Sequence, residues 1–290
     1  MALQWPLILF TSLVCAGAGL VAVEGLFALL GKGKKAYFPA AITALALVVL
    51  GGIFVFFHLE HAERIFNGFG HITSGITQEL IGMVLVVIAM VLFLLMLRRS
   101  EDKTVPAWVP IVGLVVSALL IVAMGHSYMM DSRPAWNNIL QLLSLLGAAF
   151  ILGPATVAVY AAIKKVEIPE LGLYNVIGTL VNAVLTCGFM LSMNAASSSF
   201  ESFAYYFDPT HPNYPMKSGA DVSLFSGDSL TAVVIIIIAI VVSIIAAFIG
   251  KKQGNKWLTW GSIIVVCGLA CAIALRCVMY SMGATMFMLY

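Results

Sequence analysis

The chain has 290 residues, of which 62% are hydrophobic and only 10% are charged, and its formal net charge at pH 7 is +2. Its mean hydropathy of +1.06 is far above that of a soluble domain. This composition excludes an ordinary water-soluble protein and gives no basis for a nucleic-acid partner, because the charges are confined to short segments between apolar runs. The sequence therefore predicts a multi-pass integral membrane protein.

Eight apolar runs reach the length of about 20 residues that a helix needs to cross a bilayer. In chain order they cover residues 5–30, 37–59, 75–97, 105–130, 137–163, 171–193, 229–249 and 257–288. The first run lacks a basic segment before it and is too long for a cleaved signal peptide, so we expect a retained first span. The fold class predicted is an all-α bundle of about eight transmembrane helices, forming one domain over residues 1–290.

The basic residues predict the orientation of this bundle, because short cytoplasmic loops retain Lys and Arg. The connections after the first, third, fifth and seventh runs carry eleven basic residues, namely Lys32, Lys34, Lys35, Arg98, Arg99, Lys103, Lys164, Lys165, Lys251, Lys252 and Lys256. The opposite side carries three, Arg64, Arg133 and Lys217. We therefore expect both termini on the non-cytoplasmic side of the cell inner membrane.

The longest connection, residues 195–228, is expected on this outer side and contains FESFAYYFDPTHPNYP. One interpretation is an ordered cap on the bundle. The other is a docking surface for a second subunit, because exposed aromatic residues favour interfaces.

Ionisable side chains are costly inside a bilayer, so those near the spans are the first candidates for function. The segment 56–80, FFHLEHAERIFNGFGHITSGITQEL, is the richest in such residues. If the second helix continues into it, His58 and His61 share one face, and Glu60 can pair with Arg64. Glu79 is expected about one turn inside the third span. The structural alternative for this segment is a solvated loop with an internal salt bridge.

Three further positions interrupt apolar runs. Arg276, with Tyr280 one turn later, requires an acidic or carbonyl partner, and either a structural pair or an anionic or quinone-like ligand would explain it. Glu24 is expected to extend from the inner end of the first span to the interface. Gly153 and Pro154 predict a kink that serves helix packing.

Several cofactor sites are not supported by the spacing of residues. The five cysteines, Cys15, Cys187, Cys267, Cys271 and Cys277, form no CxxC pair and have no histidine at zinc-ligand spacing. The run GLFALLGKGK lacks the Ser or Thr of a phosphate loop. A pair of haems would need axial histidines at both depths of the membrane, whereas all five histidines are expected on the outer side. One outer haem held by His58 or His61 together with His126 stays geometrically possible, but no haem or metal is predicted.

Six segments spread along the chain resemble one family. They are WPLILFT from Trp5, HLEHAERIFN from His58, QELIG around Glu79, RPAWNNI from Arg133, the Gly153-Pro154 step, and ALRCVMY from Ala274. In this order and spacing the chain resembles the membrane anchor subunits of dimethyl sulfoxide reductases, the DmsC family, and more distantly the polysulfide reductase anchors.

The resemblance implies a subunit of anaerobic respiration that oxidises menaquinol and passes electrons to an iron–sulfur subunit. A further partner subunit would carry the molybdopterin cofactor and reduce the terminal acceptor. Within this chain the resemblance implies quinol contacts at His58 and Glu79 and no cofactor of its own. The extra residues in HLEHAER leave both His58 and His61 as candidates for the base.

The residues at the outer rim suggest the remaining members of the site. His58 is the expected proton acceptor, Glu79 its orienting or proton-relaying partner, and Arg276 and Tyr280 the groups for the opposite quinone oxygen, with His61 and Arg64 beside them. Two alternatives stay open. One is a secondary transporter that uses Glu24, Glu79 and Arg276, and the other is a haem b-binding cytochrome subunit.

Overall fold

The computed structural model describes residues 3–59, 61, 65, 67, 69–197, 223–225 and 227–283. Over these ranges the chain forms helices and no strand. The helices are α1 (Trp5–Leu29), α2 (Lys34–Phe56), α3 (Gly75–Arg99), α4 (Trp108–Ser127), α5 (Ile139–Ile163), α6 (Leu171–Ser197), α7 (Gly227–Lys252) and α8 (Trp257–Met282). All eight of these described helices are long and apolar enough to cross a membrane, which confirms the predicted fold class.

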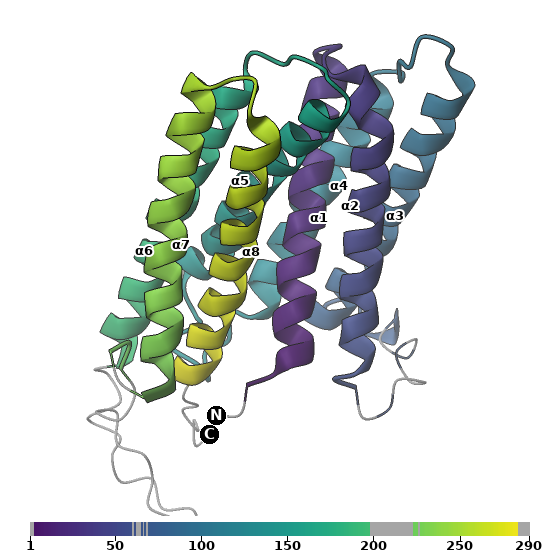
Figure 1. Cartoon of the computed structure of the whole chain (residues 1–290). Helices are drawn as coiled ribbons and strands as arrows, with labels where there is room; N and C mark the ends of the chain where they lie inside the picture. Colours follow the sequence, from purple (N-terminus) through teal and green to yellow (C-terminus); the bar gives the residue numbers. More distant parts are fainter. Residues whose placement is uncertain are drawn as a thin grey trace, which may run out of the picture.

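The helices run up and down through the bundle, so that alternate connections gather at the same end (Figure 1). One end, called here the basic end, carries the connections α1–α2, α3–α4, α5–α6 and α7–α8, with their lysines and arginines. The start of α1 and the end of α8 lie at the other end, called here the terminal end (Figure 1). An even number of spans places both termini at one end of a bundle and the first, third, fifth and seventh connections at the other. The structure has this arrangement.

Helices α1 and α5 form the centre of the bundle. In the apolar 18-residue stretch of each of these two helices 67% of the residues are buried, against 33% to 50% in the corresponding stretches of the other described helices. Glycines allow this close packing: a Cβ on Gly153 would lie 2.4 Å from the carbonyl oxygen of Gly19, and one on Gly19 would lie 2.4 Å from that of Ala149. Helix α5 continues through Pro154 without interruption. The Gly153-Pro154 step therefore allows the backbones of α1 and α5 to come into contact. Small residues commonly have this role between membrane helices.

Local sequence explains two of the helix boundaries. Pro6 occupies the first turn of α1, where its missing N–H removes no helical hydrogen bond. Asn138 caps α5 by accepting a hydrogen bond of 2.9 Å from the Leu140 backbone N–H. Because this cap fixes the start at Ile139, α5 begins two residues later than the sequence predicted.

The end of α2 differs from the sequence expectation in a way that affects the site. The helix ends at Phe56, and the backbone N–H groups of Phe57 and His58 bond to the carbonyl oxygens of Phe54 and Val55, three residues back, at 3.2 and 2.9 Å. These tighter bonds close the helix. The predicted end of α2 at residue 59 is therefore wrong, and the condition under which His58 and His61 would share one helical face is not met.

Candidate functional site

An apolar groove separates α2 from α3 near the terminal end. It has a volume of about 210 Å³ and is called here the α2–α3 groove. The residues that line it come mainly from α2 and α3: Phe10 of α1; Val48, Val49, Gly52, Val55 and Phe56 of α2; Ile65; and Ile76, Glu79, Leu80, Met83, Val84, Val87 and Ile88 of α3. Several lining residues also face the outside of the bundle, Ile76 being 59% exposed. Because these outward faces are apolar and belong to two helices long enough to cross a membrane, we infer that the groove opens sideways toward lipid.

Glu79 is the only ionisable side chain among the described residues that line this groove. It is the fifth residue of α3, about one turn inside the helix as predicted, and only 7% of it is exposed. The hydroxyl of Ser127, the last residue of α4, donates a hydrogen bond to its carboxylate Oε1. Gly75 makes this contact possible, because a Cβ there would lie 2.5 Å from the Cβ of Ser127. The groove thus ends at a carboxylate held between two helices.

A cluster of aromatic residues lies next to Glu79 at the terminal end. The Trp136 ring stands edge-on to Tyr128 and Tyr280, with ring centroids 6.2 and 5.3 Å apart. The indole N–H of Trp136 donates to the Met279 carbonyl oxygen at 2.7 Å, and Arg133 stacks over the indole at 4.3 Å. These contacts fix the α4–α5 connection against the last turns of α8.

Arg276 lies deeper in the bundle, outside the groove. It is 3% exposed, donates to the Ser144 hydroxyl at 2.6 Å and to the Met279 sulfur at 3.1 Å, and stands over the Phe189 ring at 5.9 Å. No carboxylate of a described residue lies within ion-pair distance of it. The sequence led us to expect an acidic or carbonyl partner, and the described part of the chain instead offers a hydroxyl, a thioether and an aromatic face.

Arg276 and Glu79 have three neighbours in common. Cys15, Tyr128 and Tyr280 each lie near both groups. The Tyr280 hydroxyl is buried, and the hydroxyl of Tyr128 is its neighbour. Two buried tyrosines therefore lie near both Glu79 and Arg276.

The histidines predicted for the site lie elsewhere. His58 and His61 are exposed, follow the end of α2, and do not contribute to the lining of the groove among the described residues. Arg64 and its expected partner Glu60 fall outside the described residues, as does most of the outer connection, residues 198–222. His126 is exposed in the last turn of α4, one residue before the serine that holds Glu79. The structure thus places Tyr280 near both Glu79 and Arg276, with Glu79 on the groove and Arg276 deeper in the bundle. His58 and His61 do not line the groove among the described residues.

Sequence reasoning missed Ser127, Tyr128, Trp136 and Ser144, which are partners or neighbours of the charged groups. The sequence marks the segment containing Trp136 only through its resemblance to one family. A polar residue at the end of an apolar run was the available signal for Ser127, yet nothing in the chain identifies Glu79 as its partner, 48 residues away.

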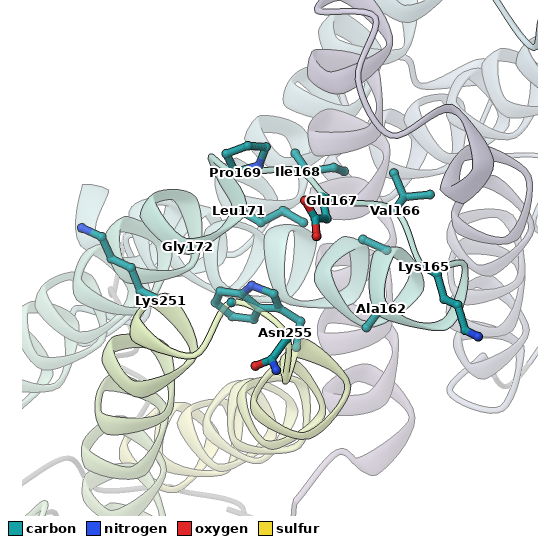
Figure 2. A pocket seen from close by; sticks show the side chains of 13 residues that line it. Ala162, Lys165, Val166, Glu167, Ile168, Pro169, Leu171, Gly172, Lys251 and Asn255 are labelled. Carbon is teal, nitrogen blue, oxygen red and sulfur yellow. The ribbon is translucent and has the colours of Figure 1, made fainter.

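Glu24 also differs from its expectation. It is 2% exposed and faces the interior, so it does not extend to the interface as we expected. Near it, at the basic end, lies a larger cavity of about 540 Å³ between the α5–α6 and α7–α8 connections (Figure 2). This basic-end cavity lies between two connections and is lined by exposed lysines, whereas the exposed side chains of the α2–α3 groove are apolar.

Comparison with known proteins identifies one matching segment. Residues 171–274, from the start of α6 into α8, match a family described as a protein of unknown function (DUF4064). No curated protein matches the chain. The matching segment contains neither the α2–α3 groove nor Arg276 and Tyr280.

Proposed function

We propose that this multi-pass membrane protein is the anchor and menaquinol-oxidising subunit of an anaerobic respiratory complex of the dimethyl sulfoxide reductase type in the cell inner membrane. Its electrons would pass to an iron–sulfur subunit and then to a molybdopterin-containing catalytic subunit. The observation that carries the proposal is the α2–α3 groove, which opens to lipid and ends at the buried carboxylate of Glu79.

The groove fits the size and polarity of a quinol head group. Its volume of about 210 Å³ lies below the range of roughly 300–1,000 Å³ of pockets that enclose a whole drug-sized ligand. A ring can enter while a long isoprenoid tail stays in the bilayer. Apolar side chains from α1, α2 and α3 would contact the ring, and the carboxylate would accept a hydrogen bond from one quinol hydroxyl.

The chemistry follows from this placement. Oxidation of a quinol to a quinone releases two electrons and two protons. Glu79 is positioned as the first proton acceptor, and the Ser127 hydroxyl bonded to it stabilises the ionised form. His58, exposed beyond the end of α2, is available for proton transfer to water at the terminal end. The electrons leave to the iron–sulfur partner, which would dock on this same end.

The test uses the complete complex, purified with the proteins that accompany the chain and placed in lipid nanodiscs. Glu79→Gln should slow menaquinol oxidation by about 100-fold, the usual range for loss of a positioned proton acceptor being 10²–10⁴-fold. Glu101→Gln, which removes an exposed carboxylate at the basic end, serves as the matched control and should oxidise menaquinol at the normal rate. Reduction of the terminal acceptor by an artificial donor bypasses the quinol and should be normal in both variants.

The effects of the histidine variants distinguish the groove from the outer rim. Because His58 lies outside the groove, His58→Ala should slow menaquinol oxidation less than Glu79→Gln does. Normal oxidation by Glu79→Gln would contradict the proposal. Ion-coupled uptake by the chain alone would support the transporter alternative, and a haem absorption spectrum of the purified chain would support the cytochrome alternative.

A further inference from the structure

Glu24 is an acidic side chain enclosed in the bundle without a partner. Only 2% of it is exposed, and neither carboxylate oxygen accepts or donates a hydrogen bond among the described residues. It lines a cavity of about 10 Å³ between α1, α2 and α5, which has room for about one water molecule. An ionised carboxylate in such a place is costly, so the surroundings favour its neutral form.

The charged and titratable groups that face Glu24 do not neutralise it. Tyr37 of α2 lines the same cavity, but its hydroxyl is directed to the carbonyl oxygens of Phe27 and Lys32, at 2.9 and 2.7 Å. The ammonium of Lys32, in the α1–α2 connection, is paired with Glu170 of the α5–α6 connection. The remaining lining is apolar or small and includes Val157 of α5 and Ile168.

Ile168 lies between this small cavity and the basic-end cavity, because it lines both. Figure 2 shows Ile168 beside Pro169 at the edge of the larger cavity, and the lysine side chains of Lys165 and Lys251 extending away on opposite sides. The larger cavity also contains Glu167, an exposed carboxylate next to Ile168 in the chain. Ile168 therefore lies between the enclosure around Glu24 and a larger cavity that contains an exposed carboxylate.

We propose that Glu24 is a proton-binding site that exchanges with water at the basic end, with Ile168 as the barrier between the basic-end cavity and the carboxyl. The ligand is a proton, which adds to the carboxylate to form the neutral acid, together with the single water for which the cavity has room. This site lies at the opposite end from the α2–α3 groove and does not depend on quinol oxidation there.

Infrared spectroscopy of the full chain in nanodiscs tests the proposal directly. A protonated carboxyl gives a C=O stretching band that shifts when its hydrogen is replaced by deuterium. Subtracting the spectrum of Glu24→Gln from that of the wild type isolates the band of Glu24, and the same subtraction with Glu79→Gln isolates any band of Glu79. The two carboxyls are thus followed separately in one protein.

We expect a protonated band for Glu24 at neutral pH and a shift of that band after transfer to D₂O. Ile168→Ala should accelerate the shift by at least about tenfold, because it shortens the buried side chain that separates the two cavities. Ile264→Ala removes the same atoms from a buried isoleucine of α8 that lines neither cavity, and should leave the rate unchanged. Ile168→Val replaces Ile168→Ala if the larger truncation prevents folding.

Two results would overturn the proposal. One is the absence of a Glu24 carboxyl band at every pH at which the protein stays folded, which would mean that the group is permanently ionised. The other is an exchange rate that neither Ile168 variant changes. Neither result bears on menaquinol oxidation, which is measured with Glu79→Gln in the assembled complex.

Discussion

Replacing Gly153 by alanine tests how closely α1 and α5 are packed at the centre of the bundle. The added Cβ would lie 2.4 Å from the Gly19 carbonyl oxygen, whereas ordinary contacts begin at 3.4 Å. The two backbones must therefore separate by about 1 Å, and a backbone atom cannot move aside as a flexible side chain can. Overpacking of this kind costs about 1–3 kcal/mol of folding free energy.

This cost corresponds to a decrease of about 2–6 °C in the thermal midpoint, at about 2 °C per kcal/mol for a chain of this size. The measurement is thermal unfolding of the full chain in one detergent, followed by tryptophan fluorescence. Gly188→Ala in α6 is the matched control, because its Cβ would meet Leu140 side-chain atoms at ordinary distances of 3.6 and 3.9 Å. Equal midpoints for the two variants would refute the close packing of α1 on α5.

Three further predictions concern charged groups. Arg276→Met removes a buried cation that has no carboxylate partner among the described residues, so the thermal midpoint should rise. A decrease would contradict this and would mean that the contacts of Arg276 with Ser144, Met279 and Phe189 outweigh the cost of burying its charge. Ser127→Ala removes the hydrogen bond to Glu79 and should slow menaquinol oxidation by about tenfold, less than Glu79→Gln, while artificial-donor activity is unchanged; a normal rate would contradict the role of that hydroxyl. The hydrogen bond from Lys32 holds the pKa of the Glu170 carboxyl below its ordinary value of 4.5, so the pair stabilises the fold above pH 4.5 and ceases to do so as pH falls through the lowered pKa. As pH falls through that acidic range, the free energy of unfolding should therefore decrease less for Glu170→Gln than for the wild type. If the two proteins gave parallel plots of unfolding free energy against pH, the pair would not be contributing to stability.

The sequence was sufficient to predict the helices and the depth at which the main charged residues lie within them. A long apolar run in a bilayer forms a helix, because the backbone N–H and C=O groups find no water there and must form hydrogen bonds within the helix. The position of Glu79 about one turn inside α3 and the burial of Arg276 within α8 follow from the same counting.

The direction in which a side chain points could not be predicted in the same way. Helix α1 is apolar on every side, so nothing in its sequence marks the face that turns Glu24 toward α5. Helix α2 ends three residues before the predicted end at Leu59, because the apolar run itself continues to Leu59, whereas the closing hydrogen bonds depend on backbone geometry. The pairing of Ser127 with Glu79 depends on the axial offset between the packed helices α3 and α4. The order of residues in the chain does not specify this offset.

The sideways opening of the α2–α3 groove has a consequence for how any ligand is measured. A molecule that enters from between lipid chains is presented at its mole fraction in the membrane and not at its concentration in water. Its apparent affinity will then weaken as more lipid is added at constant total ligand, and among related inhibitors the apparent potency will follow their partition into the bilayer. Binding constants for this groove are therefore comparable between preparations only when the ratio of ligand to lipid is held fixed.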